Sequence, residues 1–140
     1  LVIMRDTTME MIARSETDPL SGALNRRGFE THGDRAVVRA RRTDQPLSLI
    51  TLDLDRFKAI NDSFGHAAGD RVIADLAGLL DDTVGSDDLV ARLGGEEFAI
   101  LLPGRTTAQA KALAERMRLA VARDLPVRQR ARGYRVVRRG

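Results

Sequence analysis

The chain contains no cysteine, and this absence limits both its covalent and its metal chemistry. Without cysteine there can be no disulfide framework and no thiolate metal site. The only two histidines, His32 and His66, do not make a zinc site. The lack of cysteine fits a reducing environment, so we expect a cytoplasmic protein.

Long hydrophobic runs are missing as well. No uninterrupted apolar stretch approaches the roughly 20 residues that a membrane helix needs, so we expect no direct membrane insertion. Residues 1–18 carry acids within their apolar part and no small-residue cleavage site, which argues against a signal peptide. The chain also lacks a Gly-x-x-x-x-Gly-Lys-Ser/Thr loop, which excludes a P-loop NTPase.

The composition that remains is that of a folded domain with an uneven charge. The 140 residues are 43% hydrophobic and 31% charged, which suits one globular domain. The net charge is +3, but residues 123–140 hold seven arginines against one acid, so the rest of the chain is net −3. A basic tail can bind an anionic partner. Because its only aromatic residue is Tyr134 and it holds no nucleic-acid motif, we expect no nucleic-acid function.

The order of predicted elements indicates helices packed over a sheet. The apolar run 47–54 predicts a buried strand, and residues 89–93 and 98–102 predict a hairpin. Helices are expected over residues 1–16, from the N-cap Asn25 to about Arg42, as a short turn at Arg56–Ile60, over residues 68–82, and after a capping box at Thr106 and Gln109. We predict no element after Pro126. Alternating strands and helices are typical of an α/β or α+β domain.

Two groups of carboxylates stand at the ends of these predicted strands. Asp53 follows the apolar part of the run 47–54, and Glu96 and Glu97 lie in the hairpin turn. Each group has an ordinary explanation, because an Asp at a strand end often caps the next turn and acids in turns are often only solvated. If the hairpin pairs beside the first strand, however, Asp53 and Glu96 come together. An oxygen-only site of this kind suits Mg²⁺, which usually completes its shell with substrate phosphates.

A polar segment between these acids offers groups that can recognise a guanine. The Asn61 amide provides a donor and an acceptor, and the Asp70 carboxylate accepts hydrogen bonds. Gly65 and Gly69 fit a bent loop before the next helix. Taken alone, the segment is better explained as an ordinary polar loop whose Asp70 caps a helix.

Three runs of residues together resemble the GGDEF domain family of diguanylate cyclases. Residues 18–29, DPLSGALNRRGF, are similar to the opening signature of that family, and residues 53–70 are similar to its second block. Residues 92–98, RLGGEEF, match the signature itself in its GGEEF form. The resemblance covers about residues 15–122. It implies an α+β sandwich whose central, mostly antiparallel sheet is covered by helices, as in nucleotidyl cyclases and polymerase palm domains.

The resemblance also implies an activity and a set of site residues. Such domains condense two GTP molecules into cyclic di-GMP and release pyrophosphate, working as a homodimer with Mg²⁺ or Mn²⁺. The implied metal ligands are Asp53, the Leu54 carbonyl, Glu96 and Glu97. The implied catalytic residues are Glu96, which helps to deprotonate the 3′-hydroxyl, with Asp53 and Glu97. The implied GTP-binding residues are Asn61, Asp70, His66, Lys58, Phe57, Gly94 and Gly95.

The chain departs from the family pattern at an inhibitory product site of the form Arg-x-x-Asp. Asp88 occupies the Asp position, but Gly85 stands where the Arg would be. Without a guanidinium there is no bidentate grip on the product. We therefore expect this site to be degenerate, with weak or absent feedback inhibition.

A second departure concerns the ends of the chain. Residues 1–17 resemble a connecting helix from an upstream sensor or receiver domain, residues 18–122 an incomplete catalytic domain, and residues 123–140 an Arg-rich tail unlike the family. The initial Leu1 also indicates a piece of a longer protein. The loss of a central strand would leave backbone groups unpaired. An active cyclase is thus one hypothesis, an impaired GTP-binding or dimerisation module is the second, and an interaction protein using its basic tail is the third.

Overall fold

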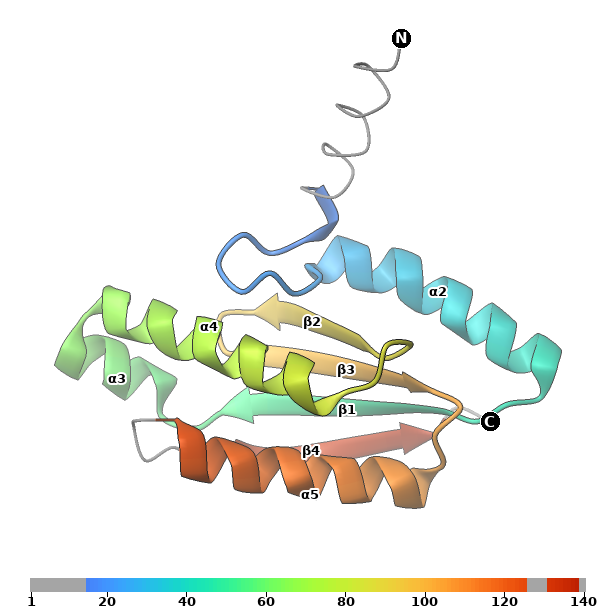
Figure 1. The fold of residues 1–140 in the computed structure, drawn as a ribbon. Helices are drawn as coiled ribbons and strands as arrows, with labels where there is room; N and C mark the ends of the chain where they lie inside the picture. Colours follow the sequence, from blue (N-terminus) through green and yellow to red (C-terminus); the bar gives the residue numbers. More distant parts are fainter. Residues whose placement is uncertain (1–14, 126–130, 139–140) are drawn as a thin grey trace, which may run out of the picture.

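The computed structural model describes residues 15–125 and 131–138, and within these ranges the chain forms one sheet with helices on both faces (Figure 1). The strands are β1 (Leu47–Leu54), β2 (Leu89–Gly94), β3 (Glu97–Pro103) and β4 (Ala131–Arg138). They lie in the order β2-β3-β1-β4, and all three pairings are antiparallel. The predicted α+β fold with an antiparallel sheet is therefore confirmed. Residues 1–14, the greater part of the expected connecting helix, lie outside the described ranges.

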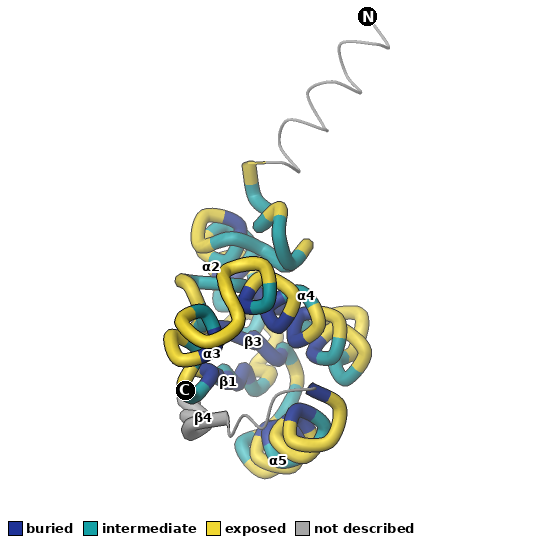
Figure 2. Tube along the Cα trace, turned by 90° about the vertical axis from the view of Figure 1, so that its left-hand side faces the viewer, coloured by how far each residue is buried: buried dark blue, intermediate teal, exposed yellow. Residues whose placement is uncertain are grey.

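Helices lie on both sides of this sheet. They are α2 (Arg26–Thr43), α3 (Phe57–Phe64), α4 (His66–Thr83) and α5 (Thr107–Asp124). Helices α4 and α5 cover one face, and α2 crosses the other (Figures 1 and 2). The predicted starts of two helices are confirmed, because the Asn25 side chain accepts from the Gly28 N–H at the start of α2 and α5 opens with the Thr106–Gln109 capping box. No helix within the described ranges has the length and low polarity needed to cross a bilayer.

The main core lies between the sheet and the helices α4 and α5. Successive side chains of a strand point to opposite faces, so alternate residues of β1 enter this core while Asp53 is exposed. The buried cluster includes Ile50, Leu52, Leu54, Ile73, Leu76, Leu80, Phe98, Ile100, Leu102, Leu113, Met117 and Val121. This packing holds β1 firmly in the middle of the sheet (Figure 2). The carboxyl end of β1, with the exposed Asp53, therefore has a fixed position next to the core.

The segment after β1 is more helical than the sequence predicts. The expected short turn extends to all of α3, and α4 begins at His66 without the expected loop. Asp70 is therefore inside α4 and does not cap it, which corrects the loop interpretation. The chain turns between the two helices at Gly65, whose φ of 88° favours glycine.

Strand β4 corrects the prediction that no element follows Pro126. It pairs with β1 from Ser48 opposite Arg138 to Leu54 opposite Ala131, with an irregularity between Thr51 and Asp53. The frequent arginines hide the apolar alternation from which strands are predicted. The pairing has a physical reason, because the backbone groups of a central strand need partners on both sides.

Candidate active site at the carboxyl end of β1

The carboxyl end of β1 lies beside the β2–β3 hairpin, as the predicted site requires. Asp53 is directly opposite Glu97 in the β1–β3 register, and the Leu54 N–H donates to the Glu96 carbonyl over 3.3 Å. Asp53 and Glu97 are exposed, Glu96 is half-buried, and the Leu54 side chain is buried. The implied metal-binding residues from β1 and from the hairpin therefore lie together at one end of the β1–β3 strand pair.

The donors at this edge fit a cation that binds together with a phosphate ligand. Directly opposite residues of an antiparallel pair have Cβ atoms about 4.5–5.5 Å apart, so Asp53 and Glu97 can offer carboxylate oxygens to one ion. Within residues 15–125 and 131–138, no three His, Asp or Glu side chains form a ready-made metal cage. Mg²⁺ is commonly held by one or two carboxylates and takes its remaining ligands from phosphates and water. The donor set therefore fits Mg²⁺ as a partner of a nucleoside triphosphate.

Arg92 anchors the hairpin turn that carries these acids. Its Nε and Nη2 donate to the Gly95 carbonyl over 3.1 and 2.9 Å, and its Nη1 lies 3.3 and 3.2 Å from the two Asp18 carboxylate oxygens. One guanidinium thus ties the turn to the segment before α2. No role was predicted for Asp18 or Arg92, although both lie within the signature runs. That position is the signal that could have identified them.

Asp18 is itself held in its charged form. Burial raises the pKa of Asp18, but hydrogen bonds from the Ser21 hydroxyl (2.7 Å) and the Ser21 N–H (2.9 Å), together with the charged Arg92, outweigh it. The net result is a pKa below the ordinary value of 3.8. The ionised carboxylate is therefore the form that supports the hairpin anchor.

This lowered pKa predicts a pH-dependent contribution to stability. The native state binds the Asp18 proton more weakly than the unfolded state, so the stabilisation is present above pH 3.8 and is lost as the pH falls through the lower, native pKa. We expect Asp18→Asn to reduce the free energy of unfolding by about 1–3 kcal/mol at pH 7. In urea unfolding at a series of pH values, the difference in the free energy of unfolding between the two proteins should close as the pH falls below 3.8. A gap of the same size at pH 7 and in strong acid would contradict this assignment.

The two signature glycines leave room in front of the acids. A Cβ atom on Gly95 would meet nothing within 4 Å, and one on Gly94 would meet only Glu97 Oε2 at 4.0 Å. Neither glycine has a left-handed φ, so the turn does not need glycine for its backbone conformation. Their small size instead keeps the backbone open to a ligand.

The predicted guanine-reading residues lie on two adjoining helices. A Cβ atom on Gly69 would lie only 1.8 Å from Asn61 Oδ1, so the Asn61 amide on α3 lies directly against α4 where only glycine fits. Asp70 is the next residue of α4 and is exposed, and His66 lies one turn before it on the same side of the helix. The fold therefore brings Asn61 to the turn of α4 that carries Asp70 and His66.

The predicted phosphate-binding residues open α3. Phe57 is its first residue and Lys58 is exposed in its first turn. The preceding Arg56 has a left-handed φ of 59° and makes no side-chain cap, so the first N–H groups of α3 have no such capping partner. The N-terminal turn of a helix and a nearby ammonium group suit an anionic ligand.

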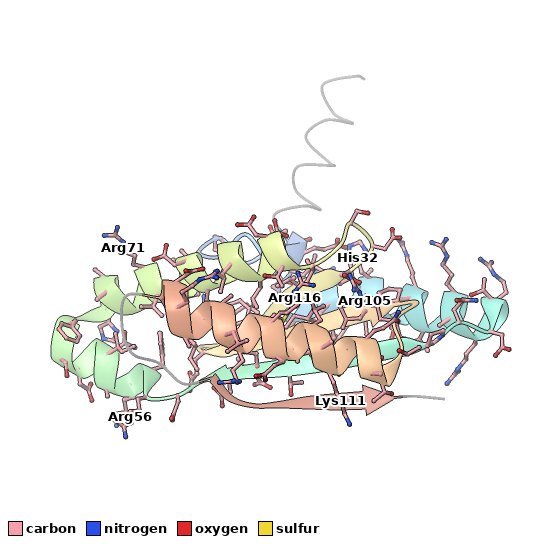
Figure 3. The ribbon with its side chains drawn as sticks, turned by 60° about the horizontal axis from the view of Figure 1, so that its bottom comes forward. His32, Arg56, Arg71, Arg105, Lys111 and Arg116 are labelled. Carbon is pink, nitrogen blue, oxygen red and sulfur yellow. The ribbon has the colours of Figure 1, made fainter. Side chains whose placement is uncertain are left out.

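In the degenerate product site, Asp88 is paired with an arginine from elsewhere in the chain, Arg105. The Asp88 side chain is 3% exposed, and it accepts hydrogen bonds from the Gly85 N–H (2.7 Å) and from Arg105 Nη2 (2.9 Å). Arg105 comes from the turn between β3 and α5, and a Cβ atom on Gly85 would lie 3.4 Å from its Nη2. Arg105 lies well away from Arg56, the residue that precedes α3 (Figure 3). This ion pair was not predicted from the sequence.

An antiparallel sheet with helices on both faces and carboxylates at the β1–β3 edge defines a palm-like α+β domain. A family model described as diguanylate cyclase, GGDEF domain, matches residues 15–135, so the match reaches into β4. The chain belongs to the GGDEF domain family.

Individual relatives agree with this assignment. The chain is 44% identical over 106 residues to diguanylate cyclase DgcP of Pseudomonas aeruginosa, which covers 76% of this chain and 16% of that protein. It is 39% identical over 119 residues to the response regulator PleD of Caulobacter vibrioides, which covers 85% of this chain and 26% of that protein. The chain thus spans only a small part of the curated relatives it matches.

Solved structures share the fold. The coiled coil and GGDEF domain of DgcB from Caulobacter crescentus, in complex with c-di-GMP, matches with a TM-score of 0.90 and 26% identity over 98% of this chain and 76% of that one. The active GGEEF domain of a diguanylate cyclase from Vibrio cholerae matches with a TM-score of 0.75 and 36% identity, covering 83% of this chain and 76% of that one.

Proposed function

We propose that this chain condenses two molecules of GTP into cyclic di-GMP and releases pyrophosphate. The observation that carries the proposal is that Asp53 on β1 lies opposite Glu97 of the β2–β3 hairpin. Arg92 anchors the turn of this hairpin to Asp18. The family assignment and the names of the relatives support the same reaction.

Each group of residues has a proposed role in that reaction. Asn61 and Asp70, with His66 near them, hold the guanine edge, while Lys58 and the backbone at Phe57 hold the phosphates. Glu96 accepts the proton of the attacking 3′-hydroxyl. Asp53, Glu97 and the Leu54 carbonyl, with Glu96, hold a divalent ion. When bound, Mg²⁺ or Mn²⁺ neutralises charge on the phosphates, so the protein mainly positions the reactants.

We infer that the active form is a homodimer. The proposed constellation holds one nucleotide, yet the product contains two, and each 3′-hydroxyl must attack the α-phosphate of the other nucleotide. Two copies that face each other bring both reactions within reach. We further propose a cytoplasmic protein whose residues 1–17 connect residues 18–122 to an upstream sensor or receiver, with β4 of the tail 123–140 pairing with β1.

The direct test is incubation of the purified chain with GTP and Mg²⁺, followed by chromatography for cyclic di-GMP and pyrophosphate. We expect both products in the ratio of one to two, none when a chelator removes the metal, and a rate per chain that rises with protein concentration. Absence of product at every protein concentration, from a chain that still unfolds cooperatively, would overturn the proposal.

The alternative is a module that binds GTP or dimerises without turnover. It was motivated by the expected loss of C-terminal elements, one of which β4 supplies beside β1. A GTP-dependent rise in melting temperature without any product would favour this alternative.

The internal ion pair of Asp88 predicts weak feedback inhibition. Because Arg105 already takes the Asp88 carboxylate and Gly85 offers no guanidinium, cyclic di-GMP finds no free Arg–Asp pair there. We expect initial rates to be insensitive to added cyclic di-GMP at concentrations up to that of the GTP substrate. Strong inhibition that disappears in Asp88→Ala would refute this expectation.

A further inference from the structure

Phe64 is an aromatic residue that the described fold does not bury. It is the last residue of α3 and is 69% exposed. By contrast, Phe98 is fully buried, and Phe57 packs against the core cluster. Single exposed apolar side chains are common on protein surfaces, so the meaning of Phe64 depends on what lies beside it.

Phe64 lies on the side of α3 that carries Asn61. Phe57, Asn61 and Phe64 recur at the spacing i, i+4 and i+7, which places them on one stripe of the helix. This stripe faces α4, because a Cβ atom on Gly69 would lie 1.8 Å from Asn61 Oδ1 and 3.3 Å from Phe57 Cζ. Phe64 extends the same stripe toward the corner at Gly65, and its exposure means that α4 leaves its ring open.

The neighbouring polar groups can recognise the edge of a purine but not its face. Asn61 and Asp70 offer hydrogen bonds in the plane of a base. The two flat faces of that base are apolar, and they are stabilised by stacking on an aromatic side chain, which tolerates any base. Phe64 supplies an open aromatic ring on the stripe that carries Asn61.

We propose that Phe64 is a stacking platform for the purine base of the nucleotide whose edge Asn61 and Asp70 recognise. The inference rests on the proposed function, since it concerns the same nucleotide site. Phe64 supplies affinity without distinguishing guanine from adenine, and the hydrogen-bonding residues supply the selectivity. Phe64 is thus a positioning residue for the base, and it takes no part in proton transfer.

The test measures equilibrium binding of 3′-deoxy-GTP and 3′-deoxy-ATP with Mg²⁺ by calorimetry. These nucleotides lack the attacking 3′-hydroxyl, so they bind without turnover. We expect Phe64→Ala to weaken both nucleotides by about tenfold and to leave their affinity ratio unchanged. Phe64→Tyr keeps the ring and should keep the wild-type affinity. Asp70→Asn should instead lower the preference for 3′-deoxy-GTP.

The matched control is Leu119→Ala, which truncates another exposed apolar residue, 53% exposed on α5. We expect it to bind both nucleotides as the wild type does. Unchanged affinity in Phe64→Ala, or a loss that Phe64→Tyr shares, overturns the platform, and so does a changed nucleotide ratio in Phe64→Ala. A wild-type chain that binds neither nucleotide overturns the proposed function itself, so the two failures are distinguishable.

Discussion

Replacement of Asp53 by Asn should lower the rate of cyclic di-GMP formation by about 100-fold or more and leave the fold intact. The substitution removes the one carboxylate that β1 contributes opposite Glu97, and with it a ligand for the divalent ion. Charge stabilisation by a bound metal is worth several kcal/mol in the transition state, which corresponds to a rate lower by about 100-fold or more. Asp53 is exposed, so the free energy of unfolding should change by no more than about 0.5 kcal/mol.

The measurement is the initial rate of product formation at saturating GTP and Mg²⁺, with urea unfolding of the same preparations. Asp82→Asn is the matched control, because Asp82 is an exposed Asp near the end of α4, away from the β1–hairpin edge. We expect the control to have wild-type rates. A chain with Asn at position 53 that still forms product at a wild-type rate would remove Asp53 from the catalytic site.

The second large effect concerns the tail. A chain that ends at Leu125 loses β4, so one side of β1 from Ser48 to Leu54 has no strand beside it. Several backbone N–H and C=O groups of a central strand then lose their partners, and we expect a loss of at least about 3 kcal/mol in the free energy of unfolding. The measurement is the urea midpoint, followed by the rate of product formation at a temperature where both proteins remain folded.

The appropriate control is a chain that lacks only residues 139–140, which follow β4. It should have the wild-type midpoint, because every pair of the β1–β4 register remains. If the chain that ends at Leu125 unfolds at the same urea concentration as the control, then β4 does not stabilise the sheet, and the tail is dispensable for folding.

Much of the site could be predicted because its signals are local. The apolar run before Asp53 predicts a strand that ends in a carboxylate, and the two glycines before Glu96 predict a hairpin. Both predictions depend only on the period of the apolar residues and on turn chemistry. The same is true of Asn25 and Thr106, whose side chains cap the first turns of α2 and α5.

Other features could not be predicted because their cause is far away in the sequence. Arg105, in the turn between β3 and α5, pairs with Asp88 just before β2. Arg92 contacts Asp18, which is 74 positions away in the sequence. No periodicity in the chain marks such pairs. The extension of α3 and the early start of α4 likewise depend on how Gly69 admits Asn61 between the two helices.

The sequence by itself determined the identity of the elements around the site: the buried strand ending at Asp53, the hairpin with its two acids, and the helix starts that local caps define. Only the tertiary structure decided which residues meet. It set Asp53 opposite Glu97, placed Asp70 within a helix beside Asn61, and drew the Arg-rich segment 131–138 into the sheet as β4. The physical reason is that the backbone groups of β1 need partners on both sides. This requirement arises only once the sheet is packed, and no local sequence pattern in the tail predicts that the tail will meet it.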